Sequence, residues 1–451
     1  MTSAAFTGLR RSFAGAVVLP DDAGYDHVRG CFNALIDRRP AAIARCATPG
    51  DVAAALEFGQ AEGLEIAVRG GGHNPAGHCV CDDGLVIDLS LMTRVDVDAE
   101  ACVARSQGGA TWLDFDRATQ AHGLVTPGGV VGTTGVTGLT LGGGIGHLTA
   151  QLGFTCDGLL GADVITPAGD TVRAGPDGDE ELLWGLRGGG GNFGVATQIE
   201  LRLHPLERVL GGRLVYMGDE VAKALRVYRD VAATAPGDVS VGAVLATDED
   251  TRPVLIVLPC YTGDEEEPEW LRGLRTAPGL VADQIRVHSF VAQQHVVNPS
   301  YGIERTYWKG HFVRELPDEL IDALVERMLA LGRPPGGVLI ESLAGAPKEL
   351  DDDSAALGFR DAAFNLSAMG DWLDPAHDDE GIAWTRETAA AMEPWSQTGA
   401  GYVNYMQADE PIERVRAAFG PEKFDRLQAL KDRYDPGNVL RRNQNVPPSA
   451  S

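Results

Sequence analysis

"AVRGGGHNPAG", Ala67–Gly77, is the most informative short segment of this chain. Three consecutive glycines follow a short apolar segment and precede a histidine, His73. Glycine tolerates positive φ and brings backbone N–H groups close to a ligand, so such a run can surround a phosphate or another oxyanion. From these residues alone, three roles are open for His73: a neutral donor to a phosphate, an ordinary surface residue, or a nucleophile toward an electrophilic cofactor carbon.

Two further glycine-rich segments lie downstream, "PGGVVGTTGVTGLTLGGGIGH" at 127–147 and "RGGGGNFG" at 187–194. One such run is most simply a tight turn, but three in one domain favour a diphosphate ligand. The GxGxxG match at 189–194 has no acidic residue about 20 positions later, so it is a weak dinucleotide signal. Walker, GxSxG and HExxH motifs are absent, and Cys79 and Cys81 have no second pair. We therefore expect neither a hydrolase nor a metal site.

Length and charge narrow the class of protein. A chain of 451 residues predicts two or three domains. The formal net charge of -26 opposes binding to nucleic acid and to anionic membranes. Seven scattered cysteines are typical of reduced core residues, and no apolar run reaches the length of a membrane span. We expect a cytoplasmic protein without nucleic-acid or membrane partners.

The pattern of apolar segments and turn signals in the sequence changes near residue 208. Before it, short apolar segments alternate with turn signals and helical patterns, which predicts a mixed α/β or α+β domain. After it, longer helical patterns accompany strand-like segments, and "GYVNYMQ" at 401–407 predicts another strand before a charged helix at 421–434. The predicted domains are 1–208, 209–400 and 401–451.

Four quoted segments carry a resemblance to a known family. They are "RRPAAIARCATPGDVAAALEFGQAEGLEIAVRGGGH" (38–73), "GLTLGGGIGHLTAQLGFTCDGLLGADVITPAGD" (138–170), "LWGLRGGGGNFGVAT" (183–197) and the C-terminal pair "YVNYM" and "RYDPGNVLRRNQNVPP" (402–406 and 433–448). Through them the sequence resembles the berberine bridge enzyme-like FAD-linked oxidoreductases of the vanillyl-alcohol oxidase/p-cresol methylhydroxylase superfamily, in particular bacterial members of secondary metabolism. The resemblance implies an α+β fold: a PCMH-type FAD-binding domain of two α/β subdomains, and a substrate domain with an antiparallel sheet covered by helices.

The resemblance also assigns the cofactor, FAD, and its attachment. It implies a covalent bond from His73 to the flavin 8α carbon. Many members add a bond from a cysteine, but Val131 stands at that position here, so one tether is expected. Three residues later, Thr134 replaces the valine or leucine that governs access of dioxygen in the family. The other implied cofactor-binding residues are Arg69, Gly70, Gly71, Gly72, Asn74, Gly77, His78, Gly135, Gly138, Gly142, Gly143, Gly144, Gly146, His147, Asp157, Gly194, Val195, Tyr402, Asn404 and Asn443. For His78, His147 and Asp157 a purely structural hydrogen-bonding role is an equal alternative.

Strand alternation organises the candidates for catalysis and substrate binding. On a strand, Tyr402 and Asn404 would share one face and Tyr405 the other. The resemblance implies that Tyr405 is the catalytic base, which requires a phenol pKa below its ordinary value near 10; the alternative is a half-buried aromatic residue. In "RTYWKGHFV" (305–313), alternation puts Tyr307, Lys309 and His311 on one side, either facing the substrate or on the surface. Asn365 and Trp372 are further candidates for the substrate pocket.

The implied function is oxidation of an alcohol or phenol-type carbon in a small molecule, a natural-product intermediate, with hydride transfer to flavin N5 and reoxidation by dioxygen. Two alternatives stay open. One is a flavin-dependent oxygenase that inserts oxygen into a polyketide-like substrate. The other is a noncatalytic flavin-binding relative that keeps the fold.

Overall fold

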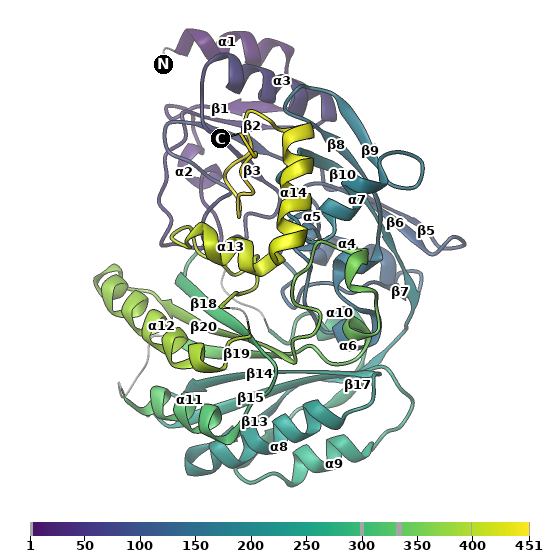
Figure 1. Ribbon diagram of the computed structural model, residues 1–451, viewed down its shortest axis with the longest axis vertical. Coiled ribbons are helices and arrows are strands. Elements are labelled where there is room, and N and C mark those ends of the chain that lie inside the picture. Colours follow the sequence, from purple (N-terminus) through teal and green to yellow (C-terminus); the bar gives the residue numbers. More distant parts are fainter. Residues whose placement is uncertain (1–2, 298–301, 331–335, 398, 451) are drawn as a thin grey trace.

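The computed structural model describes residues 3–297, 302–330, 336–397 and 399–450. Two regions are stacked along the long axis of the molecule (Figure 1). The upper region in that view contains the N-terminal sheets and the C-terminal helices, and the lower region contains one large sheet with its helices. Within the described residues, every helix is too short or too polar to cross a lipid bilayer.

The first sheet has the order β1-β2-β4-β3, from Ala16–Val18, Ala42–Arg45, Leu85–Asp88 and Ile66–Arg69. Strands β2, β4 and β3 are parallel, and α3 (Pro49–Ala61) connects β2 to β3. This helix begins with a capping box between Thr48 and Asp51, as its sequence favours. Because β3 ends at Arg69, the glycine run before His73 leaves the carboxyl end of a parallel strand, where α/β sheets bind ligands.

The second sheet is antiparallel, with the order β5-β6-β10-β8-β9, and it carries the other two glycine segments. Its strands are Val95–Asp98, Val103–Gln107, Val195–Arg202, Leu159–Ile165 and Thr171–Ala174. The second glycine segment includes α5 (Val136–Leu141), which lies between α4 (Trp112–Gln120) and β8. The third joins α7 (Glu180–Leu186) to β10. All three glycine segments therefore belong to one region of the fold.

Among the described residues, the large sheet begins with β12 at Val209 and contains nine strands. Its main path is β16-β13-β15-β14-β19-β20-β18, built from Leu280–Asp283, Leu214–Met217, Pro253–Tyr261, Val239–Thr247, Gly336–Ser342, Phe364–Trp372 and Arg305–Val313; β12 (Val209–Gly211) and β17 (Arg286–His288) pair beside β15. Helices α8 (Val221–Thr234), α9 (Glu269–Thr276), α11 (Asp318–Ala330) and α12 (Asp378–Met392) cover one face (Figure 1). The other face lies toward the glycine segments. The predicted fold class is confirmed, whereas the domain boundaries stay predictions.

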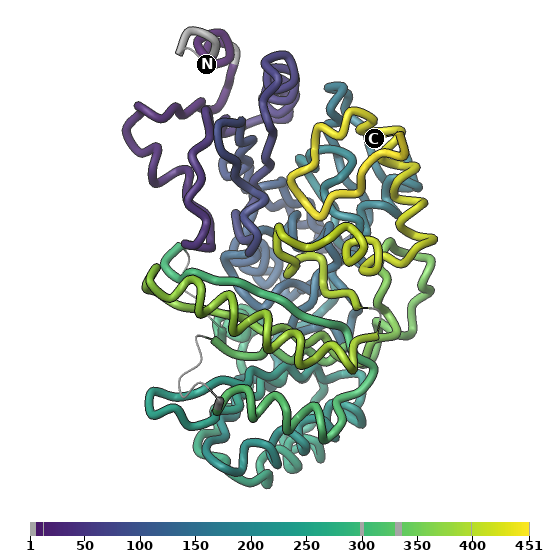
Figure 2. The backbone as a smooth tube through the Cα atoms, turned by 60° about the vertical axis from the view of Figure 1, so that its left-hand side comes forward, coloured from purple at the N-terminus to yellow at the C-terminus, as the bar shows by residue number. Residues whose placement is uncertain are grey.

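The C-terminal segment returns to the upper region, where α13 (Ile412–Phe419) and α14 (Pro421–Tyr434) pack (Figure 2). Lys431 and Asp435 on this segment form a fully buried ion pair at 2.7 Å, and the lysine also donates to the Asn192 carbonyl at 2.9 Å. The prediction of a strand at 401–407 is wrong. This stretch contains a turn in which the Tyr405 N–H donates to the Tyr402 carbonyl at 2.9 Å.

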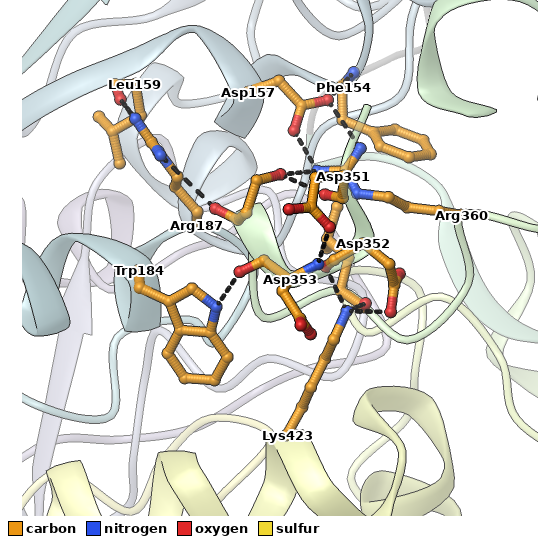
Figure 3. Close-up of polar contacts among 12 residues, drawn as sticks. Phe154, Asp157, Leu159, Trp184, Arg187, Asp351, Asp352, Asp353, Arg360 and Lys423 are labelled. Atoms are coloured by element: carbon orange, nitrogen blue, oxygen red, sulfur yellow. Dashed lines mark hydrogen bonds and ion pairs between the residues drawn. The ribbon is translucent and has the colours of Figure 1, made fainter. Parts of the chain in front are cut away.

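A long connection between β19 and β20, residues 343–363, leaves the large sheet and packs against the upper region (Figure 3). Arg360 forms an ion pair with Asp157, and both side chains are less than 10% exposed, at 4% and 8%. Trp184 donates to the Asp353 carbonyl at 2.9 Å, and Lys423 of α14 pairs with Asp352 at 2.8 Å. This connection therefore joins the two regions through one buried ion pair, one partly exposed ion pair and one hydrogen bond.

Candidate functional site

A cavity of about 730 Å³ lies between the three glycine segments and the uncovered face of the large sheet. This volume is in the range of sites for cofactors and drug-sized ligands. The glycine segments line one part of the cavity, and Leu339, Glu341, Met369 and Asp371 of the large sheet line another. Tyr402 and Tyr405 from the C-terminal segment, which follows both of these parts in the chain, also line it. The cavity is therefore formed by all three predicted domains.

The first two glycine segments touch through their backbones at Gly71 and Gly135. A Cβ atom on Gly71 would lie 2.3 Å from the Gly135 nitrogen, and one on Gly135 would lie 2.5 Å from the Gly71 nitrogen. Both distances are far below van der Waals contact, so only glycine allows this approach. The contact fixes the wall of the cavity from which His73 projects.

His73 is half-buried and its ring is held in place. Its Nε2 lies 2.9 Å from Thr133 Oγ1, and its ring stacks on Phe32 with 4.0 Å between centroids. Burial lowers the pKa of His73 to about 4, so the imidazole is neutral at pH 7. A neutral imidazole carries a nitrogen lone pair, which is the form required of a nucleophile.

The polar atoms of the cavity fit a large polar cofactor. His78 Nε2, Thr137 Oγ1, His147 Nε2 and Asn443 Oδ1 line the cavity, are buried, and have no hydrogen-bond partner within the described parts of the chain. Buried polar atoms in native proteins are normally paired, so these four indicate a bound polar ligand. Cβ atoms on Gly138 and Gly191 would meet nothing within 4 Å, which leaves open space over two stretches of backbone. These residues fit FAD.

Most of the predicted cofactor-binding residues line this cavity. They are Gly70, Gly71, Gly72, His73, Asn74, His78, Val131, Thr134, Gly135, Gly138, Gly142, Gly146, His147, Gly194, Val195, Tyr402, Asn404 and Asn443. Arg69, Gly77, Gly143, Gly144 and Asp157 do not line it. Arg69 pairs with Asp88 at 2.7 Å behind the first loop, and Asp157 pairs with Arg360. Gly77, Gly143 and Gly144 have positive φ and shape turns.

The turn at 402–405 brings two tyrosine rings together. Tyr402 and Tyr405 are three residues apart and pack edge to face with 4.8 Å between centroids. The Tyr402 hydroxyl accepts hydrogen bonds from the Gly144 N–H at 2.7 Å and from the Asn404 side-chain amide at 2.8 Å. Tyr402 therefore anchors the turn to the second glycine segment, while the Tyr405 hydroxyl donates elsewhere.

The partner of Tyr405 is Glu341, which the sequence analysis missed. The phenol donates to Glu341 Oε1 at 3.3 Å, and Asn365 donates to Oε2 at 2.7 Å. Burial raises the pKa of Glu341 to about 7. Burial and the charge of Glu341 raise the pKa of Tyr405 well above 10, opposite to the direction expected of a free base. The signal in the sequence was a carboxylate inside the apolar strand "GGVLIES".

The strand β18 presents the opposite face from the one expected to bind substrate. Tyr307, Lys309 and His311 do not line the cavity; they bond to Asp409 at 2.8 Å, Glu410 at 2.8 Å and Ser396 at 3.0 Å, respectively. Trp308 lines it instead, edge to face with the Tyr405 ring at 5.0 Å. The predicted alternation of side chains along β18 is confirmed. The odd-numbered side chains, however, pack against α12 and the C-terminal segment instead of facing the cavity.

Asn365 and Trp372, on β20, also lie outside the cavity lining. Asn365 supports Glu341, and the Trp372 indole donates to Asp378 at 2.7 Å.

Comparison with known proteins gives consistent matches along the chain. Residues 40–175 match the FAD binding domain family, and residues 401–447 match the berberine and berberine-like family. The chain is 30% identical to (R)-6-hydroxynicotine oxidase of Paenarthrobacter nicotinovorans, over 98% of each protein. It is 35% identical to FAD-linked oxidoreductase hasG of Aspergillus fumigatus, over 95% of this chain and 96% of that protein.

Solved structures match to a similar extent. The crystal structure of 6-hydroxy-D-nicotine oxidase from Arthrobacter nicotinovorans has a TM-score of 0.87 at 30% identity and covers 96% of this chain and 98% of its own. Berberine bridge enzyme from Eschscholzia californica has a TM-score of 0.89 at 22% identity and covers 99% of both chains. The second match shows the same fold.

Proposed function

This chain belongs to the FAD-linked oxidoreductases of the berberine bridge enzyme-like family, and we propose that it oxidises an alcohol or phenol-type carbon of a small organic substrate, with dioxygen as the electron acceptor. The observation that carries the proposal is the hydrogen bond between Tyr405 and Glu341 inside a cavity shared with the glycine segments. A proton acceptor thus lies in the space that would hold both cofactor and substrate.

The Tyr405–Glu341 pair supplies the proton acceptor. FAD, when bound, supplies a two-electron acceptor in the same cavity. A phenol with a raised pKa is a poor base on its own, whereas a carboxylate with a pKa near 7 is well matched to neutral pH. In this proposal Tyr405 takes the proton of the substrate hydroxyl as it passes its own proton to Glu341. Tyr405 remains the group that contacts the substrate, and Glu341 holds the proton.

His73 is proposed as the covalent attachment point of the flavin, and as the single one. Its neutral imidazole supports this role, because only the neutral ring carries the nitrogen lone pair that a bond to carbon requires. Val131 also lines the cavity, but its side chain has no group that forms such a bond. Thr134, beside it in the lining, places a small side chain with a hydroxyl on the same wall.

An anaerobic screen tests the oxidation. The purified yellow protein is mixed without oxygen with panels of sugars, alcohols, phenols, amines and polyketide-like compounds, and bleaching of the flavin absorbance is followed. We expect bleaching by members of one chemical class and recovery of colour when air is admitted. Protein that binds no flavin, or flavin that no panel bleaches, would overturn the proposal.

A second measurement separates an oxidase from an oxygenase. Turnover under ¹⁸O₂ is expected to give unlabelled product and one hydrogen peroxide per substrate oxidised. Incorporation of ¹⁸O into the product would replace the oxidase by the oxygen-inserting alternative.

A further inference from the structure

The second glycine segment ends in His147, and one nitrogen of its ring lacks a partner. His147 lines the cavity and is 5% exposed. Its Nδ1 lies 3.4 Å from the side-chain nitrogen of Gln293. Its Nε2 is buried and has no hydrogen-bond partner among the residues that the structure describes. Polar atoms buried in native proteins are normally paired, so we expect a bound molecule to supply this partner.

Gln293, the last residue of α10 (Phe290–Gln293), fixes which nitrogen of His147 carries the proton. Its amide nitrogen also lies 3.4 Å from the Pro259 carbonyl, and its amide oxygen lies 2.9 Å from His288 Nε2. A backbone carbonyl only accepts hydrogen bonds, so the amide turns its NH₂ group toward Pro259 and His147. Nδ1 of His147 is then an acceptor, and the proton of the neutral ring lies on Nε2.

Packing keeps Gln293 and His147 in this arrangement. Gln293 is fully buried, and a Cβ atom on Gly211 would lie 2.3 Å from its amide oxygen, so the amide fits only because residue 211 is glycine. Burial lowers the pKa of His147 to about 4, so the ring is neutral at pH 7. His147 therefore presents an uncharged N–H donor to the cavity.

The donor lies where the second glycine segment meets the large sheet. Ala150, three residues after His147, donates through its N–H to Ser240 Oγ of β14 at 3.0 Å. Ser240 is two residues before Gly242, which is paired in register with Glu341 of β19. Two residues along a strand and one step across to its neighbour span about 8 Å. Ser240, Gly242 and Glu341 all line the cavity, so the donor and the Glu341 carboxylate border the same part of it.

The cavity lining from β14 and β15 is otherwise largely apolar. It includes Val244, Ile256 and Leu258. Against such a wall, a molecule that leaves the N–H of His147 unpaired loses about tenfold or more in affinity relative to one that accepts from it. The other unpaired polar atoms of the cavity, which are left for the cofactor, belong to His78, Thr137 and Asn443.

We propose that the Nε2–H group of His147 donates a hydrogen bond to a carbonyl or hydroxyl oxygen of the substrate, whose apolar body lies on β14 and β15. Gln293 is the positioning residue that presents this N–H. The inference rests on the proposed function, because it assigns the donor to the molecule that Tyr405 deprotonates and not to FAD. The preferred substrates then carry an oxygen acceptor at a second position, apart from the carbon that is oxidised.

Binding of two matched probes to the holoenzyme tests this donor. Acetophenone has a carbonyl oxygen where 2-phenylpropene has a CH₂ group, and neither is an alcohol or a phenol. Calorimetric titration at pH 7.5 gives the ratio of the two affinities, acetophenone over 2-phenylpropene. In His147→Phe, which keeps a ring without the donor, we expect this ratio to fall at least about tenfold. His147→Gln keeps an N–H donor and should retain part of the preference. His122→Phe, at an exposed histidine, is the control and should leave the ratio unchanged.

The protonated nitrogen can be read without any variant fold being assumed for the binding test. Holoenzyme labelled with ¹⁵N-histidine gives long-range ¹H–¹⁵N correlations for both nitrogens of each ring, and the His147 signals are those that disappear in His147→Gln. We expect the proton of His147 on Nε2. A proton on Nδ1 would overturn the proposal, because Nε2 would then be an acceptor.

Three further outcomes overturn the contact with substrate. They are an unchanged affinity ratio in His147→Phe, binding of neither probe by the wild type, and a flavin absorbance spectrum that differs between wild type and His147→Phe without a probe, which would assign the donor to the cofactor. Binding is measured without turnover, so it is separate from the proposed oxidation. Selectivity in a protein whose flavin no panel bleaches leaves the donor standing and removes the oxidation; bleaching with an unchanged ratio does the reverse.

Discussion

The phenol oxygen of Tyr405 lies 3.3 Å from Oε1 of Glu341, although the two residues are 64 positions apart and belong to different parts of the fold. Tyr405 is on the turn that anchors to the second glycine segment, and Glu341 is on a strand of the large sheet. The hydrogen bond therefore depends on how the C-terminal segment sits over the sheet. It joins the two groups on which the proposed proton transfer depends.

Removing the carboxylate should slow the reaction more than it weakens binding. In Glu341→Gln the proton acceptor is lost while size and shape are kept, so we expect the rate of anaerobic flavin bleaching to fall about 10²- to 10⁴-fold. The wild-type rate should rise with pH through about 7, following ionisation of Glu341, and this rise should vanish in the variant. Stopped-flow absorbance measures both. Glu315→Gln, on the surface, is the control; an unchanged pH profile in Glu341→Gln would assign the ionisation to another group.

The same carboxylate should make stability depend on pH. Its pKa is raised from 4.5 to about 7 in the folded protein, so the folded state holds the proton more tightly than the unfolded state. The stabilisation that protonated Glu341 contributes to the wild type is therefore fully present below about pH 4.5. It is lost as pH rises through about 7, which lowers the free energy of unfolding by on the order of 3 kcal/mol. Glu341→Gln has no such ionisation. The thermal midpoint of the variant relative to wild type should rise by several degrees between pH 4.5 and 8, and a constant difference would contradict the assignment.

His73→Ala should lose the covalent flavin and keep the fold. We expect flavin fluorescence to remain on the wild-type band after denaturing electrophoresis and to disappear from the band of the variant, while native protein still binds FAD. His78→Ala is the matched control, because His78 lines the same cavity and its pKa is also lowered to about 4 by burial. It should retain the covalent flavin. A fluorescent band from His73→Ala would place the attachment elsewhere.

Gly71→Ala should separate the first two glycine segments. The added Cβ would lie 2.3 Å from the Gly135 nitrogen, and both partners are backbone, so one loop must move. In the His73→Ala background, where FAD would bind reversibly, we expect the affinity for FAD to fall at least about tenfold in equilibrium dialysis. Gly237→Ala in the same background, where a Cβ meets nothing within 4 Å, is the control and should bind FAD as the His73→Ala protein does. Unchanged affinity in Gly71→Ala would show that this backbone contact does not shape the site.

The buried pair between Arg360 and Asp157 should contribute strongly to stability. Arg360→Met leaves the aspartate buried and unpaired, which costs about 3–5 kcal/mol. Adding Asp157→Asn removes that charge and keeps an oxygen to accept from the Phe154 N–H, so the double variant should regain at least about 1 kcal/mol. Urea denaturation followed by circular dichroism measures the changes. Arg314→Met, which breaks an exposed pair with Asp361, should cost less than about 1 kcal/mol. Equal costs at the two sites would contradict the role of burial.

Local patterns in the sequence were sufficient to predict much of the fold and the side of the cavity that the glycine segments form. The capping box at Thr48, the helix at 421–434 and the three glycine segments each follow from residues close together in the chain. Gly71 and His73 lie at the cavity because they follow directly from the end of a parallel strand. Such features need no information about distant residues.

The side of the cavity that the large sheet forms depends on tertiary packing. Alternation defines two faces of β18, but only the packing of α12 and the C-terminal segment sets Trp308 in the cavity and Lys309 outside it. The turn at 402–405 replaced an expected strand because its tyrosine is anchored to Gly144, more than 250 residues away. Residues close together in the chain account for the loops, strands and helices around His73. The contact between Tyr405 and Glu341 arises only when distant segments meet and exclude water from the groups between them.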